Sequence, residues 1–206
     1  EIAQCLVGSE MCIRDSAMGA MNARLLNHGE IVGYIFYNML KVEGKYSDTE
    51  LAEWALIGML HDVGAIKTNM NNASLATIET TNVWAHSIYG YLFLRYLSPV
   101  GDKAEVVLYH HLPYKLHEQI NSRYIREAQY LTIADKMDLF ARAEGHNMPR
   151  DYFSTQGDID FAQKALERFY VAQKRFHVLD KLKTGEYKQE MSALFKSCLL
   201  YTSPSP

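Results

Sequence analysis

The sequence predicts an all-α fold, a helical bundle of about five core helices followed by C-terminal helices. Apolar residues recur at three- and four-residue intervals along most of the chain, which is the spacing of a buried helix face. We find no convincing pair of segments that alternate apolar and polar residues as strands do. Glycine or proline follows several of the periodic segments, at positions where helices usually end.

Seven segments are expected to be helical. They are Leu25–Leu40, Tyr46–Asp62, Asn82–Leu97, Lys103–His111, Arg126–Glu144, Asp158–Phe176 and a short last helix that begins near Glu186. In the first, Ile31, Ile35 and Leu40 fall on roughly one face. The polar stretch 67–82 is expected to be a loop or a short, weak helix.

Residues at the ends of these segments support the assignment. Ser47 or Asp48 is the expected N-cap of the second helix, because a short side-chain oxygen satisfies free amides there. Gly64 is expected to terminate the same helix and Pro113 the fourth, since neither residue favours continuation. Asp158 is the expected N-cap of the sixth helix.

Charge and hydropathy exclude several classes of function. The 206 residues carry a net charge of −3, which gives no reason to expect a nucleic-acid polymer or a membrane surface as partner. No apolar run reaches the ~18 residues of a spanning helix, so we expect no membrane segment in this piece.

The two ends differ in character from the rest. Leu6–Ser16 and Cys198–Pro206 resemble translations of opposite strands of one transposase-type sequencing adapter. We therefore interpret residues 1–16 and 198–206 as adapter sequence and expect a single domain at 17–197. The chain is then expected to be a gene fragment, which leaves room for a missing sensor or receiver domain.

All three cysteines fall in these ends, at Cys5, Cys12 and Cys198. Disulfides and thiolate ligands are therefore not expected in the domain. The composition permits a reducing compartment, and we expect the protein to be cytoplasmic.

Histidine and aspartate residues stand within otherwise apolar segments of five consecutive expected helices. They are His28, His61, Asp62, His86, His110, His111 and Asp135. A single such residue is more often a hydrogen-bonded core residue than a ligand. Taken together, these side chains would need five separate sets of buried hydrogen-bond partners. A single site with divalent metal ions would satisfy all of them. Imidazole and carboxylate ligands suit iron, manganese, zinc or nickel.

The order of these residues resembles the HD-domain metal-dependent phosphohydrolases. The local sequence is most similar to the HD-GYP branch, whose members hydrolyse cyclic di-GMP. The motifs that carry the resemblance are "MLHDVGA" (Met59–Ala65), "HSIYG" (His86–Gly90), the pair His110-His111 and "ADKMDLF" (Ala134–Phe140). It covers roughly residues 22–175, so residues 17–197 are assigned to one HD-type domain.

The resemblance implies a role for each ligand. One metal would be held by His28, His61 and Asp135, and the other by His86, His110 and His111. Asp62 would bridge the two metals, and with His61 it is assigned to the catalytic centre. The implied nucleophile is a water or hydroxide between the metals. Iron or manganese is the preferred pair of ions, with zinc or nickel as alternatives.

The sequence also departs from the family pattern. Ala65 stands where the family has a lysine that can contact substrate phosphate, and Lys67 is the candidate substitute. The loop that follows the histidine pair in the HD-GYP branch is missing, and Tyr114 is a candidate for stacking on a base. Arg24 stands one turn before His28, where an acid would support a third metal, so two metals are expected.

Three functional hypotheses remain. The first is a phosphodiesterase with a binuclear centre, with cyclic di-GMP as the leading substrate. The second is a hydrolase of another nucleotide phosphate ester, including a phosphomonoester. The third is a non-catalytic HD signalling module. The partner expected in the first two cases is a nucleotide or cyclic dinucleotide.

Overall fold

A computed structural model describes residues 23–68, 74–78, 80–143 and 145–201. The interpretation of residues 1–16 and 202–206 as adapter sequence therefore concerns parts of the chain outside the described residues. Cys198–Tyr201, which were assigned to the same adapter, form the end of the last helix.

The predicted all-α class is confirmed. The helices are α2 (Ala23–Lys41), α3 (Asp48–Met59), α4 (Leu75–Ile78), α5 (Val83–Leu97), α6 (Glu105–Tyr109), α7 (Ile125–Ala143), α8 (Arg150–Thr155), α9 (Gln163–Phe176), α10 (Val178–Thr184) and α11 (Tyr187–Tyr201). Short 3-10 helices are η1 (Val63–Ile66), η2 (Gly101–Lys103) and η3 (Tyr114–Gln119). In the described residues the only strand-like pairing is an isolated bridge between Gly157 and Phe161. Each helix in these ranges is too short or too polar to cross a bilayer.

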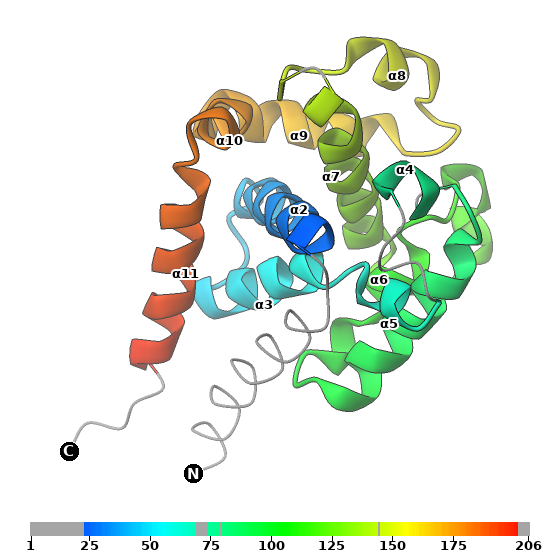
Figure 1. The fold of residues 1–206 in the computed structure, drawn as a ribbon, viewed down its shortest axis with the longest axis horizontal. Coiled ribbons are helices and arrows are strands. Elements are labelled where there is room, and N and C mark those ends of the chain that lie inside the picture. The colour runs from blue at the N-terminus through cyan, green and yellow to red at the C-terminus, as the bar shows by residue number, and fades with distance from the viewer. Residues whose placement is uncertain (1–22, 69–73, 79, 144, 202–206) are drawn as a thin grey trace.

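Helix α2 is the centre of the bundle. Every residue from Ile31 to Leu40 is buried, so the helix is enclosed on all sides rather than along one stripe. It packs against α3, α7, α9 and α10. Figure 1 shows α2 enclosed by these helices, with α11 on one side of the molecule and α5 and α6 on the other.

The backbones of α2 and α3 approach each other closely at glycine residues. A Cβ on Gly29 would lie 2.2 Å from the carbonyl oxygen of Met59, and one on Gly58 would lie 2.8 Å from the Cα of Gly33. Only glycine leaves room for such an approach. This crossing brings the start of α2, with His28, next to the end of α3, where His61 follows.

The start of α3 agrees with the sequence prediction. Ser47 is the N-cap, and it forms a capping box in which its hydroxyl accepts from the Glu50 amide and Glu50 accepts from the Ser47 amide. The helix ends at Met59, three residues before the predicted end at Asp62. The remaining residues form a turn that leads into η1.

The prediction that Asp158 caps a helix of residues 158–176 needs correction. Helix α9 begins at Gln163, and Asp158 itself has a left-handed backbone with φ 59°. Its Oδ1 nevertheless accepts from the Gln163 amide at 3.1 Å, across the turn that the Gly157–Phe161 bridge closes.

Two further segments differ from their predicted extent. Of the expected helix Lys103–His111, Lys103 is the last residue of η2 and only Glu105–Tyr109 form the α-helix α6. The expected short last helix is preceded by α10, and α11 is fifteen residues long. Gly185, with φ 82°, separates α10 from α11, because its left-handed conformation ends one helix and redirects the chain into the next.

Replacing Gly29 with alanine should destabilise the fold. The added Cβ has no space against the Met59 carbonyl, so α2 and α3 must separate, at a cost of about 3 kcal/mol in the free energy of unfolding. Urea denaturation followed by circular dichroism measures this. Ser192→Ala, at an exposed position of α11, should change it by less than about 0.5 kcal/mol. Equal effects of the two substitutions would contradict the packing described here.

Candidate metal centre

The turn after α3 delivers His61 and Asp62 into the interior, where both are buried. The Nδ1 of His61 donates to the carbonyl oxygen of Gly58 at 2.8 Å. Because a carbonyl only accepts, the proton is on Nδ1 and the lone pair is on Nε2. Asp62 is the N-cap of η1, and its carbonyl oxygen accepts from the Ala65 amide at 2.9 Å.

Helices α2 and α7 contribute His28 and Asp135. The Nδ1 of His28 donates to Asp138 Oδ2 at 2.7 Å, and the same oxygen accepts from Nη2 of Arg142 at 2.6 Å. This orients the His28 ring so that its Nε2 lies 3.2 Å from Asp135 Oδ1. Histidines that bind a metal through Nε2 usually donate the Nδ1 proton to an acceptor such as a carboxylate.

The other donors come from α5 and the end of α6. His86 lies on the buried face of α5, and His110 is the C-cap of α6. The Nδ1 of His110 donates to the Val107 carbonyl oxygen at 2.6 Å, which again leaves Nε2 with its lone pair. The His110 carbonyl oxygen accepts from Thr132 Oγ1 at 2.5 Å, a contact that joins α6 to α7.

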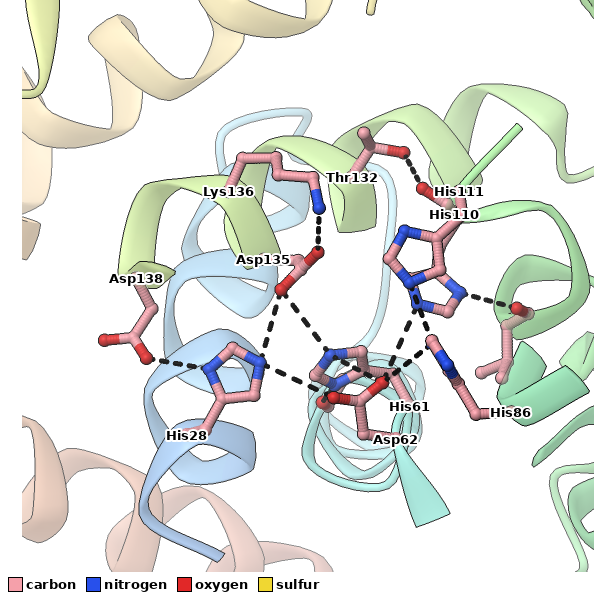
Figure 2. A network of polar contacts seen from close by, with 12 residues as sticks. His28, His61, Asp62, His86, His110, His111, Thr132, Asp135, Lys136 and Asp138 are labelled. Carbon is pink, nitrogen blue, oxygen red and sulfur yellow. Dashed lines mark hydrogen bonds and ion pairs between the residues drawn. The ribbon is translucent and has the colours of Figure 1, made fainter. Parts of the chain in front are cut away.

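The seven side chains form two adjoining groups, shown together in Figure 2. Potential ligand atoms of each group lie within 4.8 Å of one another; the first group is His28, His61 and Asp135, and the second is Asp62, His86, His110 and His111. The division of the six residues other than Asp62 is the same as the one that the family resemblance implies. Their roles as ligands stay a prediction.

Asp62 lies between the two groups. Its Oδ2 is 3.8 Å from Nε2 of His28 in the first group. Its Oδ1 is 3.4 Å from Nε2 of His86 and 3.9 Å from Nε2 of His110 in the second. One carboxylate therefore faces both groups, which is the geometry needed to bridge two cations.

Most of the donor atoms are buried and have no hydrogen-bond partner among the residues that the structure describes, which supports a metal at this position. They include Nε2 of His28, His61 and His110 and both carboxylate oxygens of Asp62 and Asp135. So many unsatisfied polar atoms in one place are costly unless a ligand satisfies them. Nitrogen and oxygen donors without thiolate fit a divalent cation such as iron, manganese, zinc or nickel.

The pKa shifts at the site follow from burial and from the carboxylates. Burial lowers the pKa of His110 to about 3, so this ring is neutral, as a metal ligand must be. Burial also lowers the pKa of His86 and of His111. Burial opposes a charge on His28 as well, but its contacts with Asp135 and Asp138 outweigh this and raise its pKa.

The shifts of the two carboxylates have the opposite sign to that expected from burial alone. Burial favours the protonated form of Asp62, yet the neighbouring His61 and His86 hold its pKa below the ordinary value. For Asp135 the same result comes chiefly from Lys136, with help from the histidines. The side chains of Asp62 and Asp135 are therefore ionised at neutral pH and can hold a cation.

Lys136 lies beside the donors, although a lone lysine on a helix is usually exposed to solvent. Its side chain is 15% exposed, and its Nζ is 3.3 Å from Asp135 Oδ2 (Figure 2). Asp138, which orients His28, was not predicted to belong to the site. Asp138 lies three residues after Asp135 on the same helix, so helical spacing around a predicted ligand was the signal that could have found it.

The two candidate substrate-binding residues are not among the donors. Lys67 is exposed at the C-terminal end of η1. Tyr114 begins η3 and lines a cavity of about 700 Å³, together with Glu43, Arg126 and Arg168 among others, that includes none of the seven donors. Ala65, in the position of the family's lysine, is fully buried.

Comparison with known proteins identifies the family. The HD domain model matches residues 25–139, which is more than half of the chain and includes all seven donors. This protein belongs to the HD domain family.

One curated relative is the 3′3′-cGAMP-specific phosphodiesterase 1 of Vibrio cholerae serotype O1. The two are 26% identical over 141 residues, which is 66% of this chain and 32% of the relative. The chain thus spans about a third of the length of that relative. No solved structure is significantly similar to this chain.

Replacing Asp62 with asparagine should remove most of the metal-binding capacity. The amide keeps the shape but loses the charge between the two groups of donors. Manganese retained per chain after dialysis, measured by mass spectrometry, should fall at least by half while the circular dichroism spectrum is unchanged. His117→Gln is the control, because His117 is also buried but bonds to the Leu112 carbonyl and to Gln129. Unchanged metal content in Asp62→Asn would refute the bridging role.

Replacing Asp138 with asparagine should have a smaller effect. The His28 ring would lose the carboxylate that orients it and makes Nε2 a better donor, so metal affinity should fall about 10- to 100-fold. Titration of the apo-protein with Mn²⁺ by calorimetry measures the dissociation constant. Asp151→Asn, on the exposed surface of α8, should leave it unaltered. Equal affinities for the Asp138→Asn variant and the wild type would show that this contact does not support the site.

Proposed function

We propose that this protein is a metal-dependent phosphohydrolase that hydrolyses a phosphodiester bond of a cyclic dinucleotide. The observation that carries the proposal is the pair of buried donor groups with Asp62 between them. Membership of the HD domain family and the relative that acts on 3′3′-cGAMP support the same class of reaction. Cyclic di-GMP is the leading substrate because of the resemblance to the HD-GYP branch, and 3′3′-cGAMP is its competitor.

Hydrolysis joins the oxygen of water to phosphorus, breaks one phosphorus–oxygen bond to ribose and gives a proton to the departing oxygen. Two divalent cations, when bound, supply Lewis acidity and a water nucleophile at neutral pH. The chain's contribution is to hold the donors rigidly. Contacts with Gly58, Val107 and Asp138 fix three imidazole rings at Nδ1, so that each turns its Nε2 toward the site.

Lys136 is the residue that we assign to the substrate phosphate. Its ammonium lies beside Asp135, at the edge of the donor cluster, and it keeps some access to solvent. A phosphodiester carries a negative charge that grows on its oxygens during attack, so a cation at this edge stabilises it. The side chain comes from α7 and not from the position of Ala65, where the family pattern has its lysine.

Two other functions compete with this proposal. A hydrolase of another nucleotide phosphate ester would use the same donors, and Ala65 together with the missing loop leaves room for a different substrate. A non-catalytic signalling module would keep the helical shell without turnover. The complete set of donors favours an enzyme, because a shell that only binds partners does not need unsatisfied buried atoms.

Turnover measurements decide among these functions. The chain loaded with Mn²⁺ or Fe²⁺ is incubated with cyclic di-GMP, 3′3′-cGAMP, a linear dinucleotide and mononucleotides, and products are separated by chromatography. We expect a cyclic dinucleotide to be opened by the wild type and not by Asp62→Asn. Turnover of mononucleotides alone would favour the second function. Metal binding without turnover of any phosphate ester would favour the third.

Replacing Lys136 with alanine should weaken substrate binding without loss of metal. We expect the KM for the cyclic dinucleotide to rise about tenfold, equivalent to about 1.4 kcal/mol, and Lys136→Arg to recover most of it. Lys164→Ala, at an exposed position of α9, is the control. A normal KM in Lys136→Ala, or a loss of bound metal equal to the loss of activity, would contradict a phosphate contact.

A further inference from the structure

Helix α5 carries a row of exposed apolar side chains on the face opposite to His86. The row consists of Trp84, Ile88, Leu92 and Tyr96, with exposed fractions of 44%, 44%, 40% and 73%. Four-residue spacing places them in a single line along the helix. Apolar groups gathered in this way on a surface usually mark an interaction site, whereas scattered ones do not.

The opposite face of α5 already has its packing partners. His86, Ser87, Gly90 and Leu94 are buried there, and the helix packs on η1, η2 and α6. Figure 1 shows α5 on the side of the molecule away from α11. The row therefore points outward from the bundle.

The low charge of this helix restricts the kind of surface that can bind to it. Arg95 is the one charged residue between Val83 and Leu97. A partner rich in charge would lose hydration against this row without gaining an ion pair, which is unfavourable. The surface that fits best is another neutral, apolar helix face.

The order of side chains along the row is nearly the same in both directions. Aromatic Trp84 and Tyr96 occupy its ends, and aliphatic Ile88 and Leu92 lie between them. A twofold axis that crosses the row midway between Ile88 and Leu92 would pair Trp84 of one copy with Tyr96 of the other, and Ile88 with Leu92. Such self-complementarity is the requirement of an isologous dimer.

The exposed area is that of a small interface. The row, together with exposed Tyr89 beside it, amounts to five large side chains that are about half exposed. At ~200 Å² for each fully exposed side chain, they offer about 480 Å² per copy and about 960 Å² in a symmetric pair. This is below the ~1,200 Å² of standard stable interfaces and in the range of weaker, transient ones.

We propose that a second copy of this chain docks on the row, so that two α5 helices pack antiparallel about a twofold axis. The proposal does not depend on the enzymatic function. The interface lies on the face of α5 opposite to His86. Dimer formation would therefore restrict the motion of the helix that carries this metal donor.

Sedimentation velocity of the full 206-residue chain at 1–100 µM (roughly the range that resolves micromolar association) tests the proposal. We expect a dimer in the wild type and a monomer in Leu92→Glu. Tyr96→Glu, at the most exposed position of the row, is a second variant with little effect on folding. Val171→Glu, at a similarly exposed position of α9, should remain a dimer.

Circular dichroism verifies that each variant keeps the helical content of the wild type. A wild type that sediments as a monomer at every concentration overturns the proposal. A dimer that persists in both Leu92→Glu and Tyr96→Glu also overturns it, because its interface would then lie elsewhere.

Discussion

Buried donor atoms that none of the described residues satisfies by a hydrogen bond govern the arrangement of this structure. They come from α2, from the turn after α3, and from α5, α6 and α7, and they converge at one place. Each such atom costs free energy when it is removed from water without a partner. Two bound cations, one at each group of donors, would offset that cost, so metal binding and the packing of five chain segments would depend on each other.

The crossing of α2 and α3 shows how the sequence achieves this convergence. Glycines at the contact remove the side chains that would hold the two helices apart. His28 then reaches the end of α3, where the chain turns and buries His61 and Asp62 together. On the other side, Thr132 ties the His110 backbone to α7, which also carries Asp135. Local backbone contacts thus set the positions of side chains far apart in sequence.

The fold class and the convergence of donors could be predicted because both follow from local patterns. Helical periodicity marks the helices, and a histidine or aspartate inside an apolar run is unusual enough to be noticed singly. The roles of individual ligands and the identity and number of the metals stay predictions.

Other features could not be predicted, because they depend on three-dimensional neighbours. Lys136 resembles any lysine on a helix surface until Asp135 is known to lie within its reach. Tyr114 is close in sequence to the histidine pair, yet η3 turns it toward a separate cavity. Asp158 caps α9 from across a turn, a contact that sequence spacing alone would not indicate.

Ala65 replaces the lysine of the family pattern, whereas the seven donors are retained. Metal binding and substrate choice therefore depend on different residues of this chain. The metal centre is accordingly the central claim. Anomalous X-ray diffraction from crystals of the manganese-loaded protein tests it most directly. We expect two manganese peaks about 3.5–4 Å apart, one beside His28, His61 and Asp135 and the other beside His86, His110 and His111, with Asp62 between them. Absence of anomalous density among these seven side chains would contradict it.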